Sequence, residues 1–129
     1  MEISKVASGG EISRLMLSVK SLVAGSIALP TIVFDEIDTG VSGEIAEKMG
    51  KIMKKMSSEL QVIDITHLPQ VAAMADFHYL VYKNHDAQTT ISNIKLLDKN
   101  ERISEIAKML SGEKISDAAY ENAQSLLNR

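Results

Sequence analysis

Residues 31–36 read Thr-Ile-Val-Phe-Asp-Glu, and this stretch decides the fold class. Three β-branched residues and an aromatic in a row predict a short strand that is buried on both faces. Such strands occur in parallel sheets, because helices cover both faces of those sheets. Two carboxylates follow at the carboxyl end of the strand, the edge at which ligands bind in open α/β folds. Asp35 and Glu36 are therefore the first candidate functional residues, although a strand that leaves the core into a polar turn has the same pattern.

The segments around this strand alternate between helix and strand. Apolar residues recur with helical spacing over residues 12–23 before the strand and over residues 42–56 after it. Residues 62–65 predict a second buried strand, and a short helix is expected at 70–74. The runs that flank residues 84–87 predict a β-hairpin. Buried strands separated by helices predict an α/β layer arrangement with parallel pairing.

Two helices are expected after the hairpin. Asn100 is expected to cap the first and Gly112 to end it, while Ser116 is expected to cap the second. No linker composition divides the chain. The residues expected to face inward from the four longer helices are Ile12, Leu15, Met16, Val19, Leu22, Val23, Ile45, Met49, Ile52, Met53, Met56, Ile103, Ile106, Ala107, Leu110, Ala119, Ala123, Leu126 and Leu127.

The composition limits the classes of protein to consider. The chain has 129 residues, of which 45% are hydrophobic and 24% charged, and this balance excludes a disordered chain. No apolar run approaches the roughly 20 residues of a membrane span, and no signal-peptide pattern is visible, so we expect a cytoplasmic protein without membrane contact. The absence of cysteine excludes disulfides and thiolate metal sites. The net charge of -3 provides no basic excess for nucleic acid, so any DNA contact is expected to lie on residues outside this chain.

A glycine-rich stretch, Ser8-Gly9-Gly10-Glu11, precedes the first helical segment. Ser8 and Glu11 have the spacing of a capping box. The two glycines allow another molecule to approach the backbone closely, and the start of a helix favours an anion such as phosphate. Taken alone, these four residues fit an ordinary helix cap after a turn better than a phosphate site.

The adjacent carboxylates fit the chemistry of nucleoside triphosphate hydrolysis. One carboxylate holds Mg²⁺, usually through water, and its neighbour polarises the attacking water. His67 follows the second buried strand at the same edge, where its imidazole could donate a hydrogen bond to a terminal phosphate. An ordinary loop histidine is the alternative. His78 and His85 have no partners at the spacing of a metal site.

The order of these features resembles that of the ATP-binding-cassette ATPases. Residues 7–11 resemble the signature motif LSGGQ, and residues 31–36 resemble Walker B with its catalytic glutamate. Residues 37–42 occupy the D-loop, and His67 occupies the switch-histidine position. The resemblance implies the C-terminal lobe of a P-loop NTPase head of α/β class, with parallel strands covered by helices plus a β-hairpin.

The residues between the motifs narrow the family. Residues 34–44 and 66–72 resemble the RecN family of bacterial DNA repair proteins, which is related to the structural-maintenance-of-chromosomes (SMC) ATPases. The resemblance runs through essentially the whole chain, including residues 101–112 after the hairpin. ABC transporters differ, because their D-loop usually reads like SALD where this chain has residues 39–42. The family implies ATP-driven engagement of two heads and work on DNA double-strand breaks and recombination, in the cytoplasm at the nucleoid.

The chain departs from the general family pattern in three respects. Ala7 stands in place of Leu and Glu11 in place of Gln, and both changes fit the SMC-like branch. The chain also lacks the Walker A loop, G-x-x-x-x-G-K-S/T, which cradles the β- and γ-phosphates. In the family this loop precedes a long antiparallel coiled coil. We therefore expect residues 1–129 to be the C-terminal half of an ATPase head whose Walker A half and coiled coil lie elsewhere.

The resemblance also implies partners and roles for single residues. The partners are ATP with Mg²⁺, a second head in an ATP-sandwiched homodimer, the N-terminal Walker A half, and DNA through the full-length protein. The signature residues Ser8, Gly9 and Gly10 are implied to bind the γ-phosphate of the second head's ATP, and Glu11 and Asp38 are further implied cofactor-binding residues. Asp35 is implied to hold Mg²⁺ through water, Glu36 to activate water, and His67 to contact the γ-phosphate of the chain's own head. Asp38 is also implied to shape the D-loop across the dimer interface.

Two alternatives remain open: the head of another SMC-like recombination ATPase, and a non-catalytic interaction module. In the second, the Asp-Glu pair only ends a strand and the Gly-Gly pair only opens a helix. A sheet that lacks the strands of an N-terminal half is expected to expose an apolar edge or face. Asp64 interrupts an otherwise apolar strand, and its partner is expected either in this chain or in the missing half.

Overall fold

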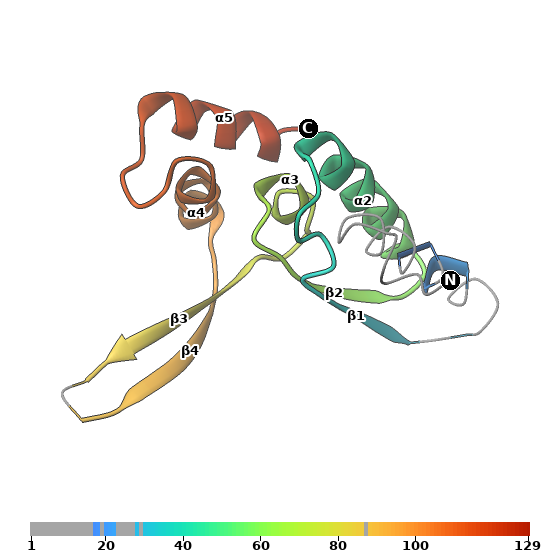
Figure 1. Cartoon of the computed structure of the whole chain (residues 1–129), viewed down its shortest axis with the longest axis horizontal. Helices are drawn as coiled ribbons and strands as arrows, with labels where there is room; N and C mark the ends of the chain where they lie inside the picture. The colour runs from blue at the N-terminus through green and yellow to red at the C-terminus, as the bar shows by residue number, and fades with distance from the viewer. Residues whose placement is uncertain (1–16, 19, 23–27, 29, 87) are drawn as a thin grey trace, which may run out of the picture. The chain divides into compact units, whose positions relative to one another are not determined.

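The computed structural model describes residues 17–18, 20–22, 28, 30–86 and 88–129, and Figure 1 shows their arrangement. The chain divides between Met74 and Ala75 into two compact units, and neither glycine nor proline marks this boundary. The elements are β1 (Thr31–Asp35), α2 (Gly43–Met56), β2 (Gln61–Ile65), α3 (Pro69–Ala72), β3 (Tyr79–His85), β4 (Thr90–Leu96), α4 (Lys99–Ser111) and α5 (Asp117–Leu127).

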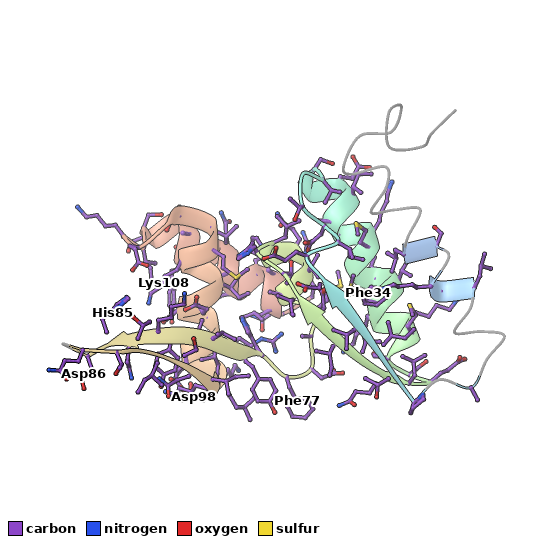
Figure 2. All side chains as sticks on the ribbon, turned by 60° about the horizontal axis from the view of Figure 1, so that its bottom comes forward. Phe34, Phe77, His85, Asp86, Asp98 and Lys108 are labelled. Carbon is purple, nitrogen blue, oxygen red and sulfur yellow. The ribbon has the colours of Figure 1, made fainter. Side chains whose placement is uncertain are left out.

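The first unit contains the two predicted buried strands, β1 and β2, as a parallel pair. Their register runs from Thr31 opposite Gln61 to Asp35 opposite Ile65, with α2 as the connection. Side chains alternate along a strand, so every second residue of β1 points to the same face of the sheet. The buried members are Ile32 and Phe34, and Figure 2 shows Phe34 between β1 and α2.

The core of this unit is built around Phe34 from methionine and aliphatic side chains. The buried residues packed with Phe34 are Leu17, Ile32, Ala46, Met49, Met53, Met56 and Val71. The apolar face predicted for α2 is thus largely confirmed, but Ile52 is exposed because it lies beside this stripe rather than on it. Among the helical residues before β1, Leu22 is exposed where we predicted burial, and Leu17 is buried instead. The other inward positions predicted for that helix lie outside the described residues.

The opposite face of the β1–β2 pair is uncovered. Val33, Ile63 and Ile65 on this face are 50%, 44% and 48% exposed. The prediction that both faces of the strand are buried is therefore wrong for this chain. The prediction of an exposed apolar face is confirmed.

The second unit consists of the hairpin β3–β4 and the helices α4 and α5. The hairpin is confirmed, with antiparallel pairing from Tyr79 opposite Leu96 to His85 opposite Thr90. The turn begins later than predicted, because His85 still belongs to the strand, and Figure 2 shows Asp86 at the tip. The two helices pack on each other through the buried residues Ile103, Ile106, Ala107, Ala119 and Ala123, as predicted. In the part of the chain that the structure describes, no helix is long and apolar enough to cross a membrane.

The start of α4 is set by Asp98 rather than by Asn100. The Asp98 carboxylate accepts a hydrogen bond from the Glu101 N–H at 2.8 Å, and the Glu101 carboxylate accepts one from the Asp98 N–H at 3.2 Å. This reciprocal pair is a capping box, and it satisfies two amides where a cap at Asn100 would satisfy one. The helix therefore begins two residues earlier than a cap at Asn100 would place it.

The end of α4 and the start of α5 agree with prediction. Gly112 follows α4 with a φ of 84°, in the left-handed region that glycine adopts without strain. Ser116 caps α5, and its hydroxyl accepts a hydrogen bond from the Ala119 N–H at 3.1 Å. Leu110, which we predicted to face inward, is exposed near the last turn of α4.

Candidate active site

The candidate catalytic residues gather at the edge where β1 and β2 both end. Asp35 is the last residue of β1 and Glu36 follows it, while His67 lies two residues after the end of β2. The Glu36 N–H donates a hydrogen bond to the carbonyl oxygen of Ile65 at 2.8 Å and so extends the pairing by one residue. Parallel strands bring their carboxyl ends to one edge, which is why residues 31 positions apart in sequence meet here.

Glu36 and His67 are in direct contact. Nε2 of His67 lies 2.6 Å from Oε1 of Glu36. Both side chains face solvent, with 82% of His67 and 47% of Glu36 exposed. An exposed contact between polar side chains adds little to stability, so this pair is better placed to meet a ligand than to hold the fold together.

Glu36 also has an unusual backbone conformation. Its φ is 53°, in the left-handed region that residues other than glycine seldom adopt. The Thr39 hydroxyl donates a hydrogen bond to the Glu36 carbonyl oxygen at 2.9 Å, and the turn continues to Gly40, which has a φ of 78°. Backbone strain of this kind is concentrated at functional sites, where the surrounding structure maintains it.

Asp38 points into the protein rather than into solvent. It is 2% exposed, and its Oδ2 accepts a hydrogen bond from the Thr66 hydroxyl. The Thr66 oxygen in turn accepts a hydrogen bond from the Leu68 N–H at 3.0 Å. Sequence reasoning missed Thr66, since a threonine beside a candidate histidine has no special pattern and its partner is 28 residues away.

Asp64 is a half-buried carboxyl in the middle of β2. It stands opposite Phe34 in the register and so belongs to the face of the sheet that α2 covers. Both carboxylate oxygens are buried without a hydrogen bond among the described residues. Burial, and secondarily the negative charge of Asp38, raise the pKa of Asp64 to about 7. The nearby N–H of Ile65 lowers the pKa of Asp64 and so offsets part of this rise, although its geometry does not meet the criteria for a hydrogen bond. Asp64 is therefore partly protonated at neutral pH.

Asp35 presents an exposed carboxylate at the same edge. This is the ligand type that Mg²⁺ prefers, and Mg²⁺ is commonly held by one or two carboxylates with water and substrate phosphates completing the shell. Within the described ranges, three or more potential metal-ligating side chains do not cluster anywhere. The chemistry of Asp35 thus fits a cation that is held mainly by water and phosphate.

The glycine-rich stretch Ser8, Gly9, Gly10 and Glu11 lies outside the described residues. The phosphate contact expected for these four residues therefore stays a prediction.

The second unit has a pocket of its own, and none of its lining residues belongs to the edge that carries Glu36 and His67. The pocket lies between the base of the hairpin and the helices α4 and α5, and Phe77, His78 and Arg102 are among its lining residues. Burial, and then the positive charge of Arg102, lower the pKa of His78. A guanidinium group of Arg102 donates a hydrogen bond to the Ala75 carbonyl oxygen at 2.5 Å. The residues that line this pocket are partly polar and partly apolar, and they include no contacting glutamate–histidine pair like Glu36 and His67.

Comparison with known proteins agrees with the resemblance found in the sequence. No family model matches the chain. The DNA repair protein RecN of Rickettsia prowazekii is 48% identical over 126 residues, and that of Bacillus subtilis is 44% identical over 127 residues. Each match covers 98% of this chain, and the chain spans 23% and 22% of the length of these two relatives.

The fold matches that of solved SMC heads. The SMC head domain from Thermotoga maritima superposes with a TM-score of 0.60 and 26% identity, covering 76% of this chain and 35% of that one. A structure from work on ATP-driven dimerisation and DNA-stimulated activation of SMC ATPases has a TM-score of 0.66 at 20% identity, covering 85% of this chain and 66% of that one. Nearly the whole chain thus matches RecN proteins, and it corresponds to about a quarter of their length. Its fold is that of the matching part of an SMC ATPase head.

Proposed function

We propose that this chain is the C-terminal half of an ATP-hydrolysing head in a RecN-like protein of DNA double-strand break repair and recombination. The observation that carries the proposal is the contact between Glu36 and His67 beside Asp35, at the carboxyl edge of a parallel sheet. The identity with RecN proteins supports the assignment to DNA repair. The fold of an SMC head supports the assignment to ATP hydrolysis.

Each residue at the edge has a distinct role in this proposal. Mg·ATP supplies the phosphoryl group, and the metal neutralises part of its charge. Asp35 would hold the cation through water, and the Glu36 carboxylate would accept a proton from the attacking water. Nε2 of His67 lies 2.6 Å from Oε1 of Glu36 in this structure, and with nucleotide bound its N–H would turn from that carboxylate to the terminal phosphate.

The proposal also includes partners outside this chain. The N-terminal half of the head would provide the Walker A loop. The ATP of a second head would receive its γ-phosphate contact from Ser8, Gly9 and Gly10, with Glu11 completing this signature stretch. Asp38 would shape the D-loop at that interface. DNA would be contacted by other parts of the full-length protein, in the cytoplasm at the nucleoid.

The first test replaces the proposed base. In the full-length protein that carries this segment, Glu36→Gln should keep ATP binding, hold the two heads together, and reduce kcat by at least about a hundredfold, because general-base catalysis contributes roughly 10²–10⁴-fold. Glu59→Gln, an exposed carboxylate of the same unit, is the matched control and should retain wild-type kcat. Wild-type turnover in Glu36→Gln would remove Glu36 as the base.

A second test separates the ATPase from a non-catalytic interaction module. The 129-residue chain by itself should not hydrolyse ATP, because the Walker A amides and lysine are needed to hold the phosphates. Co-expression with a segment that contains a Walker A loop should produce a complex that binds Mg·ATP, measured with a fluorescent ATP analogue. Turnover by the chain alone above that of its own Glu36→Gln variant would contradict the split-head proposal, and failure of the two halves to associate would favour the interaction module.

A further inference from the structure

Two loops leave the carboxyl ends of the parallel strands and carry the candidate catalytic pair. The β1 loop, residues 36–42, carries Glu36, and the β2 loop, residues 66–68, carries His67. The loops are joined in two places: by the Glu36–His67 contact, and by the hydrogen bond from Thr66 to Asp38.

The two contacts differ in burial. Glu36 and His67 are exposed, so water competes for their hydrogen bond and their geometry is easily lost. Asp38 is 2% exposed and Thr66 is partly buried, so water competes far less for their hydrogen bond. Of these two side-chain contacts, the buried one is therefore better able to set the distance between the two loops, beyond the backbone hydrogen bond from the Glu36 N–H to the Ile65 carbonyl oxygen.

The Thr66 hydroxyl acts as donor and acceptor at once. It donates to Asp38 in the β1 loop and accepts from the Leu68 N–H in its own loop, so the three residues form a continuous bridge. In the β2 loop, His67 lies between the bridge residues Thr66 and Leu68. In the β1 loop, Glu36 lies two residues before the bridge residue Asp38. A hydroxyl is the side-chain group that fills both roles from one atom, and a valine of the same shape fills neither. Loss of the hydroxyl would also leave the buried Asp38 carboxylate without this donor.

We propose that Thr66 and Asp38 are positioning residues, and that the buried bridge Asp38–Thr66–Leu68 holds the β2 loop, and with it His67, beside Glu36 at the carboxyl edge of the sheet. The proposal rests on the proposed ATPase function and adds two residues that act through the catalytic pair. Neither residue needs to touch ATP. Their removal is therefore expected to change the rate of the chemical step rather than the affinity for nucleotide.

The test is steady-state ATPase kinetics on the full-length protein that carries this segment. Thr66→Val should lower kcat by about ten- to a hundredfold, since misplacement of a catalytic group by about 1 Å is enough for such a loss. The KM for ATP should stay within about twofold of wild type. Thr66→Ser keeps the hydroxyl and should restore most of the lost kcat. Asp38→Asn keeps an oxygen acceptor and should be impaired less than Asp38→Ala.

A matched threonine controls for the loss of a hydroxyl as such. Thr31 lies at the opposite end of the same strand pair, where its hydroxyl donates to the side-chain oxygen of Gln61 at 3.1 Å. Thr31→Val should leave kcat unchanged. If Thr31→Val and Thr66→Val lose kcat equally, the two hydroxyls serve the stability of the strand pair only, and the positioning role is wrong. If Thr66→Ser loses as much kcat as Thr66→Val, the hydroxyl is not the group that matters, and the positioning role is again wrong.

The remaining outcomes distinguish this proposal from the one on which it rests. Wild-type kcat in Thr66→Val, together with an inactive Glu36→Gln, would overturn the positioning role and leave the ATPase assignment intact. Wild-type kcat in Glu36→Gln would remove Glu36 as the base, and absence of ATP turnover by the unmodified full-length protein would overturn the ATPase assignment itself. A rise in KM without a fall in kcat would also contradict the positioning role, because it would place Thr66 in nucleotide binding.

Discussion

Asp64 shows how one residue can depart from the strand around it and make the fold sensitive to pH. Its neighbours in β2 are apolar, and its carboxyl group lies on the covered face, opposite Phe34 and near the buried Asp38. Burial, and then the negative charge of Asp38, raise the pKa of Asp64 to about 7. Asp38 accepts a hydrogen bond from the Thr66 hydroxyl in the same surroundings.

The raised pKa predicts a specific pH dependence of stability. In the unfolded chain Asp64 has the ordinary aspartate pKa of 3.8, whereas in the folded chain its pKa is about 7. The stabilising effect of protonation is thus fully present below about pH 4 and is lost as the pH rises to 7. The asparagine in Asp64→Asn cannot ionise. At pH 8 the free energy of unfolding of this variant should therefore be higher than that of wild type by about 1–2 kcal/mol. This value is reduced from the full effect of the pKa shift because Asp64 is partly accessible to solvent.

Urea unfolding at pH 5 and pH 8 measures this effect. The gain of Asp64→Asn over wild type should be larger at pH 8 than at pH 5, and Glu113→Gln, an exposed carboxylate of the second unit, should show no such difference. An equal effect of Asp64→Asn at both pH values would mean that Asp64 titrates normally in the folded protein.

At the scale of elements, helix caps decide where the helices of the second unit begin. The Ser116 hydroxyl caps α5 through the Ala119 N–H, and loss of such a cap typically costs about 1 kcal/mol. Ser116→Ala should therefore lower the free energy of unfolding by that amount, measured by urea denaturation followed by circular dichroism. Ser125→Ala, on the exposed side of the same helix, should be neutral or slightly stabilising because alanine has the higher helix propensity. A neutral Ser116→Ala would show that water replaces the cap.

The caps and the edge of the sheet also show what the sequence alone can predict. Ser116 and Gly112 were predictable from local patterns, and the meeting of Glu36 with His67 follows from the parallel pairing of their strands. Asn100 was a wrong choice because Asp98 forms two hydrogen bonds with Glu101 and so competes better for the first turn. Thr66 could not be found because its role depends on a partner that is distant in sequence.

At the scale of the whole molecule, each unit leaves one apolar side of its strands uncovered. In the first unit this side carries Val33, Ile63 and Ile65. In the second unit the residue pairs Tyr79–Leu96 and Val81–Ile94 lie opposite each other on one face of the hairpin, and all four side chains are exposed. Exposed patches of this kind mark interaction surfaces. The chain spans about a quarter of its RecN relatives and 35% of a solved SMC head, so we expect the rest of the head to cover both faces.

The 129-residue chain without that covering should therefore associate with itself. The apparent mass from light scattering after size exclusion should rise with concentration, because the β1–β2 face is apolar. Within the described ranges each of the two strands also has one edge without a partner strand, and such edges pair with other chains. Ile63→Lys places a charge in the centre of this face and should shift the chain toward monomer, while Ile52→Lys, at an exposed position on α2, should not. If the chain stays monomeric at millimolar concentration, neither apolar face mediates self-association, and this prediction is wrong. Association that persists in Ile63→Lys and disappears in Val81→Lys would assign the contact to the hairpin instead.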